Sequence, residues 1–78
     1  MHLEIITPEK KLFEDEVKAL TLPGTDGSLG ILENHAPLIS ALKKGVVKVT
    51  DKTAAKHQFE IKGGVVEVLH NKVIVLAE

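Results

Sequence analysis

Residues 21–37 read TLPGTDGSLGILENHAP, and the organisation of the chain follows outward from this stretch. Two short apolar runs, residues 20–22 and 29–32, flank a Pro-Gly-Thr-Asp-Gly bend. Proline fixes φ and glycine tolerates positive φ, so Pro23 and Gly24 predict a turn, and the Asp-Gly pair behind them repeats the same chemistry. A second polar bend follows and ends at Pro37. The pattern predicts two β-strands joined by a tight loop rather than a helix.

Similar patterns run through the rest of the chain. Residues 2–7 alternate, with Leu3 and Ile5 on one face, and turn residues separate further short apolar runs. Residues 37–45 fit a strand and equally an amphipathic helical turn that stops at Gly45, so the local pattern leaves this segment open. Outside it, we expect strands at residues 2–7, 11–14, 18–22, 28–32, 46–50, 58–62, 65–69 and 73–76.

Short strands separated by turn residues are typical of an all-β fold. We predict one domain, residues 1–78, built as a small two-sheet β-sandwich or flattened barrel of about eight to ten short strands. The last two predicted strands, residues 65–69 and 73–76, are apolar on both faces. A second sheet would cover one of these faces, and a partner subunit would cover the other.

The composition argues against several classes of function. Ten basic and eleven acidic side chains give a net charge of -1, which provides no long-range attraction to nucleic acid or to an anionic membrane. The absence of cysteine excludes a disulfide framework and thiolate chemistry. No segment approaches the length of apolar sequence that a membrane-spanning helix needs. We therefore expect a soluble chain without direct membrane insertion.

Residues that could carry chemistry do not form a recognisable constellation. Asp26, Ser28 and His35 are close in sequence, but no Gly-x-Ser-x-Gly elbow is present, and Ser and Asp are common turn formers. The glycines at 24, 27 and 30 lack the Gly-Lys-Ser/Thr of a phosphate-binding loop. The histidines lack the paired spacing of a zinc site: His2, His35, His57 and His70. We expect no catalytic residue, no cofactor and no metal.

One alternative comes from another class of protein. Residues 49–54, Val-Thr-Asp-Lys-Thr-Ala, resemble the Asp-Lys hairpin tip of lipoyl carrier domains, in which the lysine carries the lipoyl arm. That resemblance would make Lys52 the modified residue. Against it, Val49 replaces the usual acidic residue before the pair, and residues 22–37 have no counterpart in carrier domains. Lys52 is more simply explained as an ordinary loop lysine.

A longer series of segments resembles the epsilon subunit of F-type ATP synthases. Members of that family carry a Pro-Gly or Gly turn, a Gly-x-Leu-Gly-Ile core and a His-Ala-Pro-Leu segment in this order, as do residues 23–24, 27–31 and 35–38 here. The similarity continues through residues 36–49, 61–68 and 73–77 and so covers essentially the whole chain. It implies a compact domain of two packed sheets, with a strand at residues 37–45.

The resemblance also implies a function and its partners. An epsilon subunit is not an enzyme itself. It is a rotor subunit at the foot of the central stalk, which couples the gamma subunit to the c-ring during ATP synthesis, on the cytoplasmic face of the bacterial plasma membrane. The positions that match c-ring contacts of the family are Thr25, Asp26, Gly27, Ser28 and Leu29. Those that match or adjoin gamma-subunit contacts are Thr7, Leu12, His35, Ser40 and Gly63.

Two departures from the family limit what the resemblance implies. Many relatives have Glu before Leu-Gly-Ile where this chain has Ser28, which weakens the case for a salt bridge to the c-ring, although Asp26 could substitute. The sequence also stops at Glu78, where many relatives continue into a helical hairpin that carries an inhibitory arm. We expect a short form without that hairpin, and coupling and assembly rather than self-inhibition.

Overall fold

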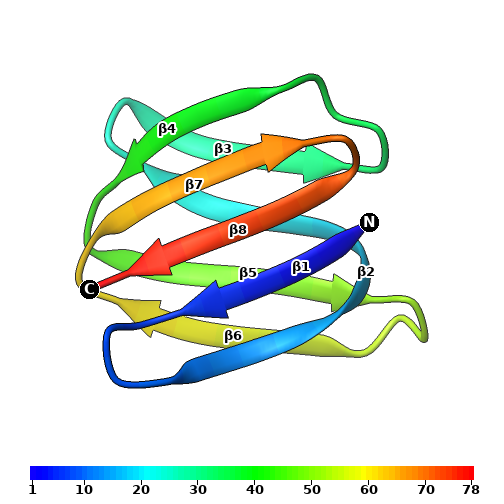
Figure 1. The fold of residues 1–78 in the computed structure, drawn as a ribbon, viewed down its shortest axis with the longest axis horizontal. Coiled ribbons are helices and arrows are strands. Elements are labelled where there is room, and N and C mark those ends of the chain that lie inside the picture. The colour runs from blue at the N-terminus through cyan, green and yellow to red at the C-terminus, as the bar shows by residue number, and fades with distance from the viewer.

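The computed structural model describes all residues 1–78 and consists of eight β-strands. Figure 1 shows them arranged in two layers around a shared interior. One layer contains β1 (His2–Ile6), β4 (Leu38–Leu42), β7 (Gly64–Leu69) and β8 (Lys72–Ala77), and the other contains β3 (Gly27–Leu32), β5 (Gly45–Asp51) and β6 (Lys56–Ile61). The predicted all-β fold with two layers is therefore confirmed.

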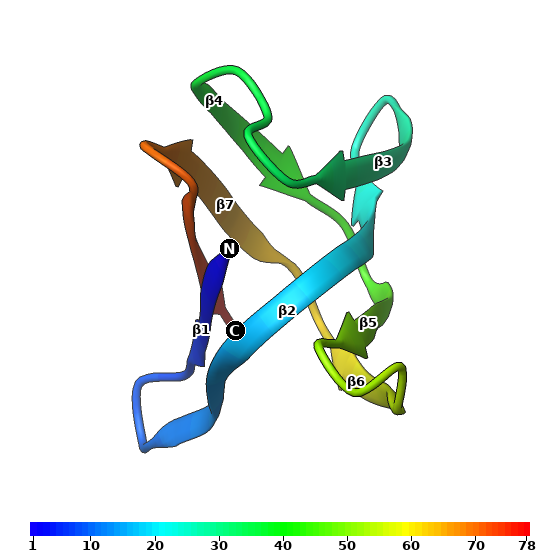
Figure 2. The same ribbon diagram turned by 90° about the vertical axis from the view of Figure 1, so that its right-hand side faces the viewer.

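The longest strand, β2 (Lys11–Gly24), belongs to both layers. Its first half pairs antiparallel with β1, from Glu16 opposite His2 to Lys11 opposite Ile6. Its second half pairs with β3 on one side and with β5 on the other. Figure 2 shows β2 running diagonally from one layer to the other. Because β1 also pairs in parallel with β8, the eight strands form one continuous hydrogen-bonded sheet folded over a common core.

The core between the layers is aliphatic. Alternate residues on each strand point inward, as the strand period of two requires, and they form one cluster of 16 buried residues. Leu3, Ile5, Val66 and Val75 are completely buried in it. Phe13 and Phe59 pack at its margin as a tilted pair with ring centroids 5.3 Å apart. Branched aliphatic side chains thus supply nearly all of the packing that stabilises the domain.

The structure corrects two expectations about the first half of the chain. Residues 11–14 and 18–22 are not separate strands, because β2 runs through them without a break and ends at Gly24, beyond Pro23. Pro23 is tolerated there because it lies beyond Thr21, where the pairing of β2 with β5 ends, so it removes no hydrogen bond from that pairing. Gly24 does not have positive φ. Glycine is needed because a Cβ at Gly24 would lie 2.5 Å from the carbonyl oxygen of Gly27.

Other local expectations are confirmed. Residues 38–42, left open between strand and helix, form β4, which pairs antiparallel with β7 along its whole length. The strands expected at residues 65–69 and 73–76 form β7 and β8, and the turn that joins them has positive φ at His70 (51°) and Asn71 (58°), the conformation of a tight two-residue hairpin turn. Helices are absent from the structure, and with them any helical segment able to cross a membrane.

Candidate interaction surfaces

The outer side of the β1–β4–β7–β8 layer exposes large apolar side chains. Ile39 has 72% of its surface exposed, Leu76 54%, Leu69 47% and Val65 39%. These residues alternate with the buried ones along their strands, so they all point away from the core. We define the apolar face as the outward apolar side chains of these strands: Ile6, Ile39, Ala41, Val65, Leu69, Ile74 and Leu76.

The strand register makes one row of the apolar face continuous, whereas in the next row Glu67 lies between Ile39 and Ile74. Val65 lies opposite Leu76, and Leu76 lies opposite Ile6 on the next strand. Ala41 extends the same row on β4, since it lies opposite Val65. Cross-strand neighbours of this kind have Cβ atoms about 4.5–5.5 Å apart, so their side chains form one surface. An apolar hollow of about 380 Å³ lies at one end of this face and is lined by Pro37, Leu38, Ile39, Glu67, Val68 and Leu69.

Charged groups lie at intervals on the same face. Glu4 lies 3.4 Å from the Lys11 ammonium and 3.9 Å from that of Lys72. His2 bridges two further carboxylates, with Nε2 2.7 Å from Glu14 Oε2 and Nδ1 2.8 Å from Glu16 Oε2. The bonds to Glu16 and Glu14 raise the pKa of His2 above its ordinary value. Charged groups thus border the apolar side chains and, at Glu67, lie among them. Protein interfaces commonly combine apolar side chains with a polar rim.

His2, Glu4 and Glu14 also bring three ligand atoms within 4.8 Å of one another. The Lys11 ammonium is bonded to Glu14 and lies beside Glu4. The two carboxylates are therefore already paired with a cation that belongs to the chain itself. The arrangement is that of a surface ion-pair network.

The predicted c-ring contacts lie together at one hairpin. Thr25 and Asp26 form the turn between β2 and β3, and the neighbouring Gly27 has a φ of 129°. The side chains of residues 25–28 are exposed, whereas Leu29 is half-buried against the core. The turn is tied to its neighbours by bonds from Thr25 N to the Ala41 carbonyl oxygen (3.1 Å) and from Lys43 N to that of Pro23 (2.8 Å). These residues form a firmly held tip at one end of the molecule (Figure 1).

The predicted gamma-subunit contacts are spread over the molecule. Thr7, in the turn after β1, and Gly63, in the turn before β7, lie at the end that carries the β2–β3 hairpin (Figure 1). His35 lies in the β3–β4 loop at the opposite end, where its Nδ1 is 2.7 Å from the Ala36 carbonyl oxygen. Leu12 and Ser40 are half-buried within β2 and β4. The five residues are therefore not one compact patch.

A polar cluster organises the loop between β5 and β6. One carboxylate oxygen of Asp51 accepts bonds from Thr53 N (2.8 Å), Thr53 Oγ1 (2.7 Å) and Ala55 N (3.0 Å). The other oxygen lies 2.8 Å from Nε2 of His57, whose ring packs against Phe13. The bond to His57, followed by those from Thr53, holds the pKa of Asp51 well below its ordinary value. Because both carboxylate oxygens of Asp51 are hydrogen-bonded to residues 53–57, its role is structural.

Comparison with known proteins identifies the family. A family model described as "ATP synthase, Delta/Epsilon chain, beta-sandwich domain" matches residues 1–78. The chain belongs to this ATP synthase delta/epsilon family. Because the match covers every residue, it leaves no support for a lipoyl carrier domain. Lys52 is an exposed residue of the β5–β6 loop.

Curated relatives agree with the family match. The ATP synthase epsilon chain of Syntrophomonas wolfei is 45% identical over 97% of this chain and 56% of its own length. That of Campylobacter concisus is 41% identical over 100% of this chain and 60% of its own length. The chain thus spans less than two thirds of these relatives. The epsilon chain of Chlorobium limicola is 43% identical, and 86% of its length is covered.

Solved structures share the fold. A chain in the mitochondrial ATP synthase structure of Euglena gracilis, described as OSCP/F1/c-ring, matches with a TM-score of 0.90 and 25% identity over 96% of this chain and 48% of its own. A chain in the central stalk/c-ring structure of Tetrahymena thermophila matches with a TM-score of 0.81 and 21% identity, covering 99% of this chain and 62% of its own, which shows a common fold.

Sequence reasoning did not name the individual residues of the apolar face. The signal was present, because β7 and β8 are apolar at both phases of the strand period. That pattern predicted a covered outer face for these strands. It did not reveal that β4 and β1 flank them in the same layer, so Ile39 and Ile6 could not be added before the topology was known.

Proposed function

We propose that this chain is a non-catalytic rotor subunit of a proton-translocating F-type ATP synthase, coupling the gamma subunit to the c-ring. The observation that carries the proposal is the family match over all 78 residues. Two surfaces of the molecule suit two partners: an apolar sheet face and an exposed hairpin at one end. As such a subunit it would be peripheral, on the cytoplasmic face of a bacterial plasma membrane.

We assign the apolar face to the gamma subunit. Exposed aliphatic side chains on a rigid sheet gain free energy when a partner removes them from water, at roughly 25 cal/mol per Å². Large contiguous apolar patches on soluble domains commonly mark protein–protein contacts. Thr7 lies in the turn after β1, at the border of this face, so this sequence-based contact fits the assignment. Ser40 lies on β4 but shares the inward phase of Leu38 and Leu42, so its side chain is not part of the face.

We assign the β2–β3 hairpin to the polar loops of the c-ring. Its turn side chains are exposed and polar, which suits a hydrated contact rather than a permanent apolar one. Ser28 and Asp26 would supply a hydroxyl and a carboxylate for hydrogen bonds to those loops. The hairpin is anchored to β4 and to the turn after it, so a load applied at its tip would pass into the sandwich.

Binding to isolated gamma subunit tests this function. We expect the purified chain to bind gamma stoichiometrically, and Ile39→Glu with Leu76→Glu to weaken binding by at least about a hundredfold, because charges would be buried in the contact. Leu32→Glu is the matched control, because Leu32 is 66% exposed but lies in the other layer.

The outcomes separate the function from the surface. If the folded chain does not bind gamma, the rotor assignment is wrong. If Leu32→Glu weakens binding as much as the double change does, gamma does not use the apolar face. A second variant, His35→Ala with Ser40→Glu, tests the contacts predicted from sequence. If only that variant lost binding, the gamma contact would lie near the β3–β4 loop rather than on the apolar face.

A further inference from the structure

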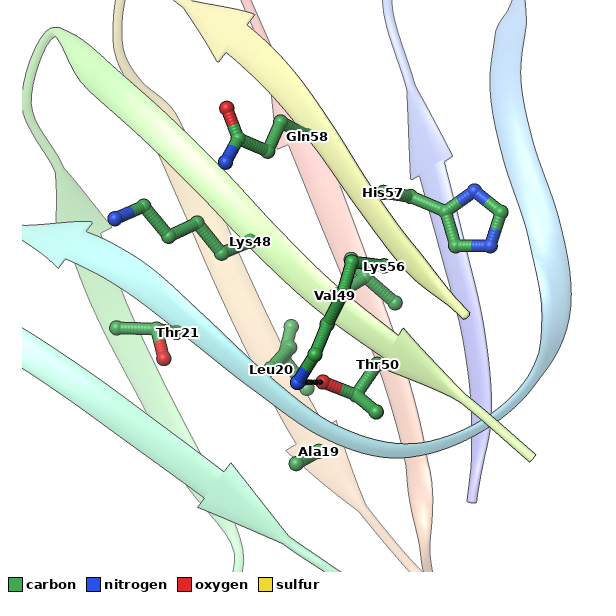
Figure 3. Close-up of a pocket in the computed structure, with 9 residues that line it drawn as sticks. All are labelled: Ala19, Leu20, Thr21, Lys48, Val49, Thr50, Lys56, His57 and Gln58. Atoms are coloured by element: carbon green, nitrogen blue, oxygen red, sulfur yellow. Dashed lines mark hydrogen bonds between the residues drawn. The ribbon is translucent and has the colours of Figure 1, made fainter. Parts of the chain in front are cut away.

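The outer side of the other layer has a different chemistry. Two hollows lie side by side on it and share Thr21 and Lys48. We call their combined surface the basic groove. The first hollow, of about 320 Å³, is lined by residues of β2, β5 and β6, among them Thr21, Lys48, Thr50, Lys56 and Gln58 (Figure 3). The second, of about 410 Å³, also includes Ser28, at the β2–β3 hairpin, and Lys43.

The strand register arranges the polar groups of the groove in rows. Lys48 lies opposite Thr21 on β2 and opposite Gln58 on β6, and Figure 3 shows its side chain between theirs. In the next row, Thr50 lies opposite Lys56, whose ammonium donates a hydrogen bond to Thr50 Oγ1 at 3.0 Å. Each row therefore presents an ammonium beside a hydroxyl or amide group, a combination that binds carboxylates.

The positive charge of the groove is not neutralised within the chain. Lys43, Lys48 and Lys56 form no ion pair, and no carboxylate lines either hollow. Glu60, on the outer side of β6, lies opposite Val46 at the margin of the second hollow, where it lines an adjoining hollow together with Lys44 and Lys62. The groove is thus locally cationic in a chain whose net charge is -1.

We propose that the basic groove binds an acidic segment of a protein. Charge complementarity selects a ligand rich in Asp and Glu, and the hydroxyl and amide groups provide hydrogen bonds that fix its position. Each hollow, of about 320 or 410 Å³, is larger than a single side chain, which suits an extended segment that lays several carboxylate side chains along the groove. A flat anionic membrane would not fill them, and the outward residues of the groove include no aromatic side chain that could insert into lipid. This binding goes beyond the rotor role and is a property of the isolated chain.

An NMR titration of the ¹⁵N-labelled full chain with a synthetic octaglutamate peptide tests the proposal. We expect amide shifts confined to the second half of β2, to β5 and to β6. The affinity should fall when NaCl is raised from about 20 mM to about 150 mM, because exposed charges are screened. Lys48→Glu with Lys56→Glu should raise the dissociation constant of the peptide at least tenfold, because two carboxylates that repel the peptide would replace two ammonium groups that attract it.

A charge-matched variant distinguishes the groove from general surface charge. Lys10→Glu with Lys52→Glu changes the net charge equally in two exposed loops and should leave peptide binding unchanged. The proposal is overturned if this control loses as much affinity as the groove variant, if the shifts are scattered over the surface, or if no shift occurs. It is also overturned if phosphatidylglycerol vesicles bind through Lys48 and Lys56 while the peptide does not. The same spectra report whether each variant is folded.

Discussion

At the scale of single residues, Asp51 determines the shape of a loop. Its carboxylate receives three hydrogen bonds from residues 53–55 and contacts His57, and these partners lose their acceptor in Asp51→Ala. The change should lower Tm by at least about 4–8 °C, the shift that 1 kcal/mol produces in a domain of this size. Calorimetry with Glu9→Ala, an exposed turn carboxylate, as control would check this expectation.

The same carboxylate makes stability depend on pH. Since the pKa of Asp51 is lower in the folded chain than its ordinary value of 3.8, its contribution is complete above that value and is lost as pH falls below it. The Tm difference between the wild type and Asp51→Ala should therefore narrow in acid. A difference that widens below pH about 4 would contradict the structural role of the ionised carboxylate.

His2 gives the opposite pH dependence. Its hydrogen bonds to Glu16 and Glu14 raise its pKa above the ordinary 6.5. Its contribution is therefore complete below the unfolded pKa and disappears as pH rises through the folded one. The Tm advantage of wild type over His2→Gln should be largest near pH about 6 and shrink toward pH about 9. The imidazole is about one-third exposed, so we expect a small effect that salt weakens; an advantage that is the same across this range would contradict it.

At the scale of elements, two glycines in strands have different requirements. Gly64 begins β7 with a φ of 147°, and a Cβ there would lie 2.1 Å from the carbonyl oxygen of Leu76 on β8. We expect Gly64→Ala to destabilise the fold by roughly 3 kcal/mol or more, because backbone must move. Gly30 has open space around it, so Gly30→Ala should change stability by less than about 0.5 kcal/mol.

Urea denaturation followed by far-UV circular dichroism would measure both changes, since the chain has no Trp or Tyr for fluorescence. If Gly64→Ala and Gly30→Ala lost equal stability, the close approach of the Leu76 carbonyl oxygen would not be the reason that position 64 needs glycine. The comparison also isolates the role of the β7–β8 pairing. That pairing supports the apolar face, because Val65 and Leu76 are neighbours across it.

How far the sequence predicts each element depends on the range of the interactions involved. The turn at His70 and Asn71 and the alternation of Leu3 and Ile5 are local, and both were predictable. The continuity of β2 was not, because residues 15–18 are mostly charged and read as a break. Pairing of this segment with β1 and then with β5 makes it a strand. The apolar face and basic groove were hidden for the same reason, since each combines residues from separate strands.

At the scale of the whole molecule, the two outer faces are chemically different. One presents Ile39, Val65 and Leu76, and the other presents Lys48 and Lys56 beside hydroxyl groups. The inner faces of both layers contribute to the same aliphatic core. A thin sandwich of this kind can therefore contact two unlike partners on opposite sides without exposing its interior. Such a geometry suits a subunit that connects two other subunits.

The crossing strand should also make the domain unfold as one unit. Leu20 lies in the second half of β2, is 3% exposed and belongs to the shared core. Leu20→Ala should cost about 2–5 kcal/mol. Because a chain of this size has a total stability of only about 4–12 kcal/mol, the variant would lie near the limit of folding. Both layers should lose this stability together, since β2 is hydrogen-bonded to each of them.

Native-state hydrogen exchange can separate cooperative from layered unfolding. In Leu20→Ala, the free energies of exchange for the most protected amides of β5 and of β8 should fall by the same amount. These strands lie in different layers and do not pair with each other. If only β5 lost protection, the layers would unfold independently and β2 would not couple them. A uniform loss would mean that a force applied to one face is resisted by the whole sandwich.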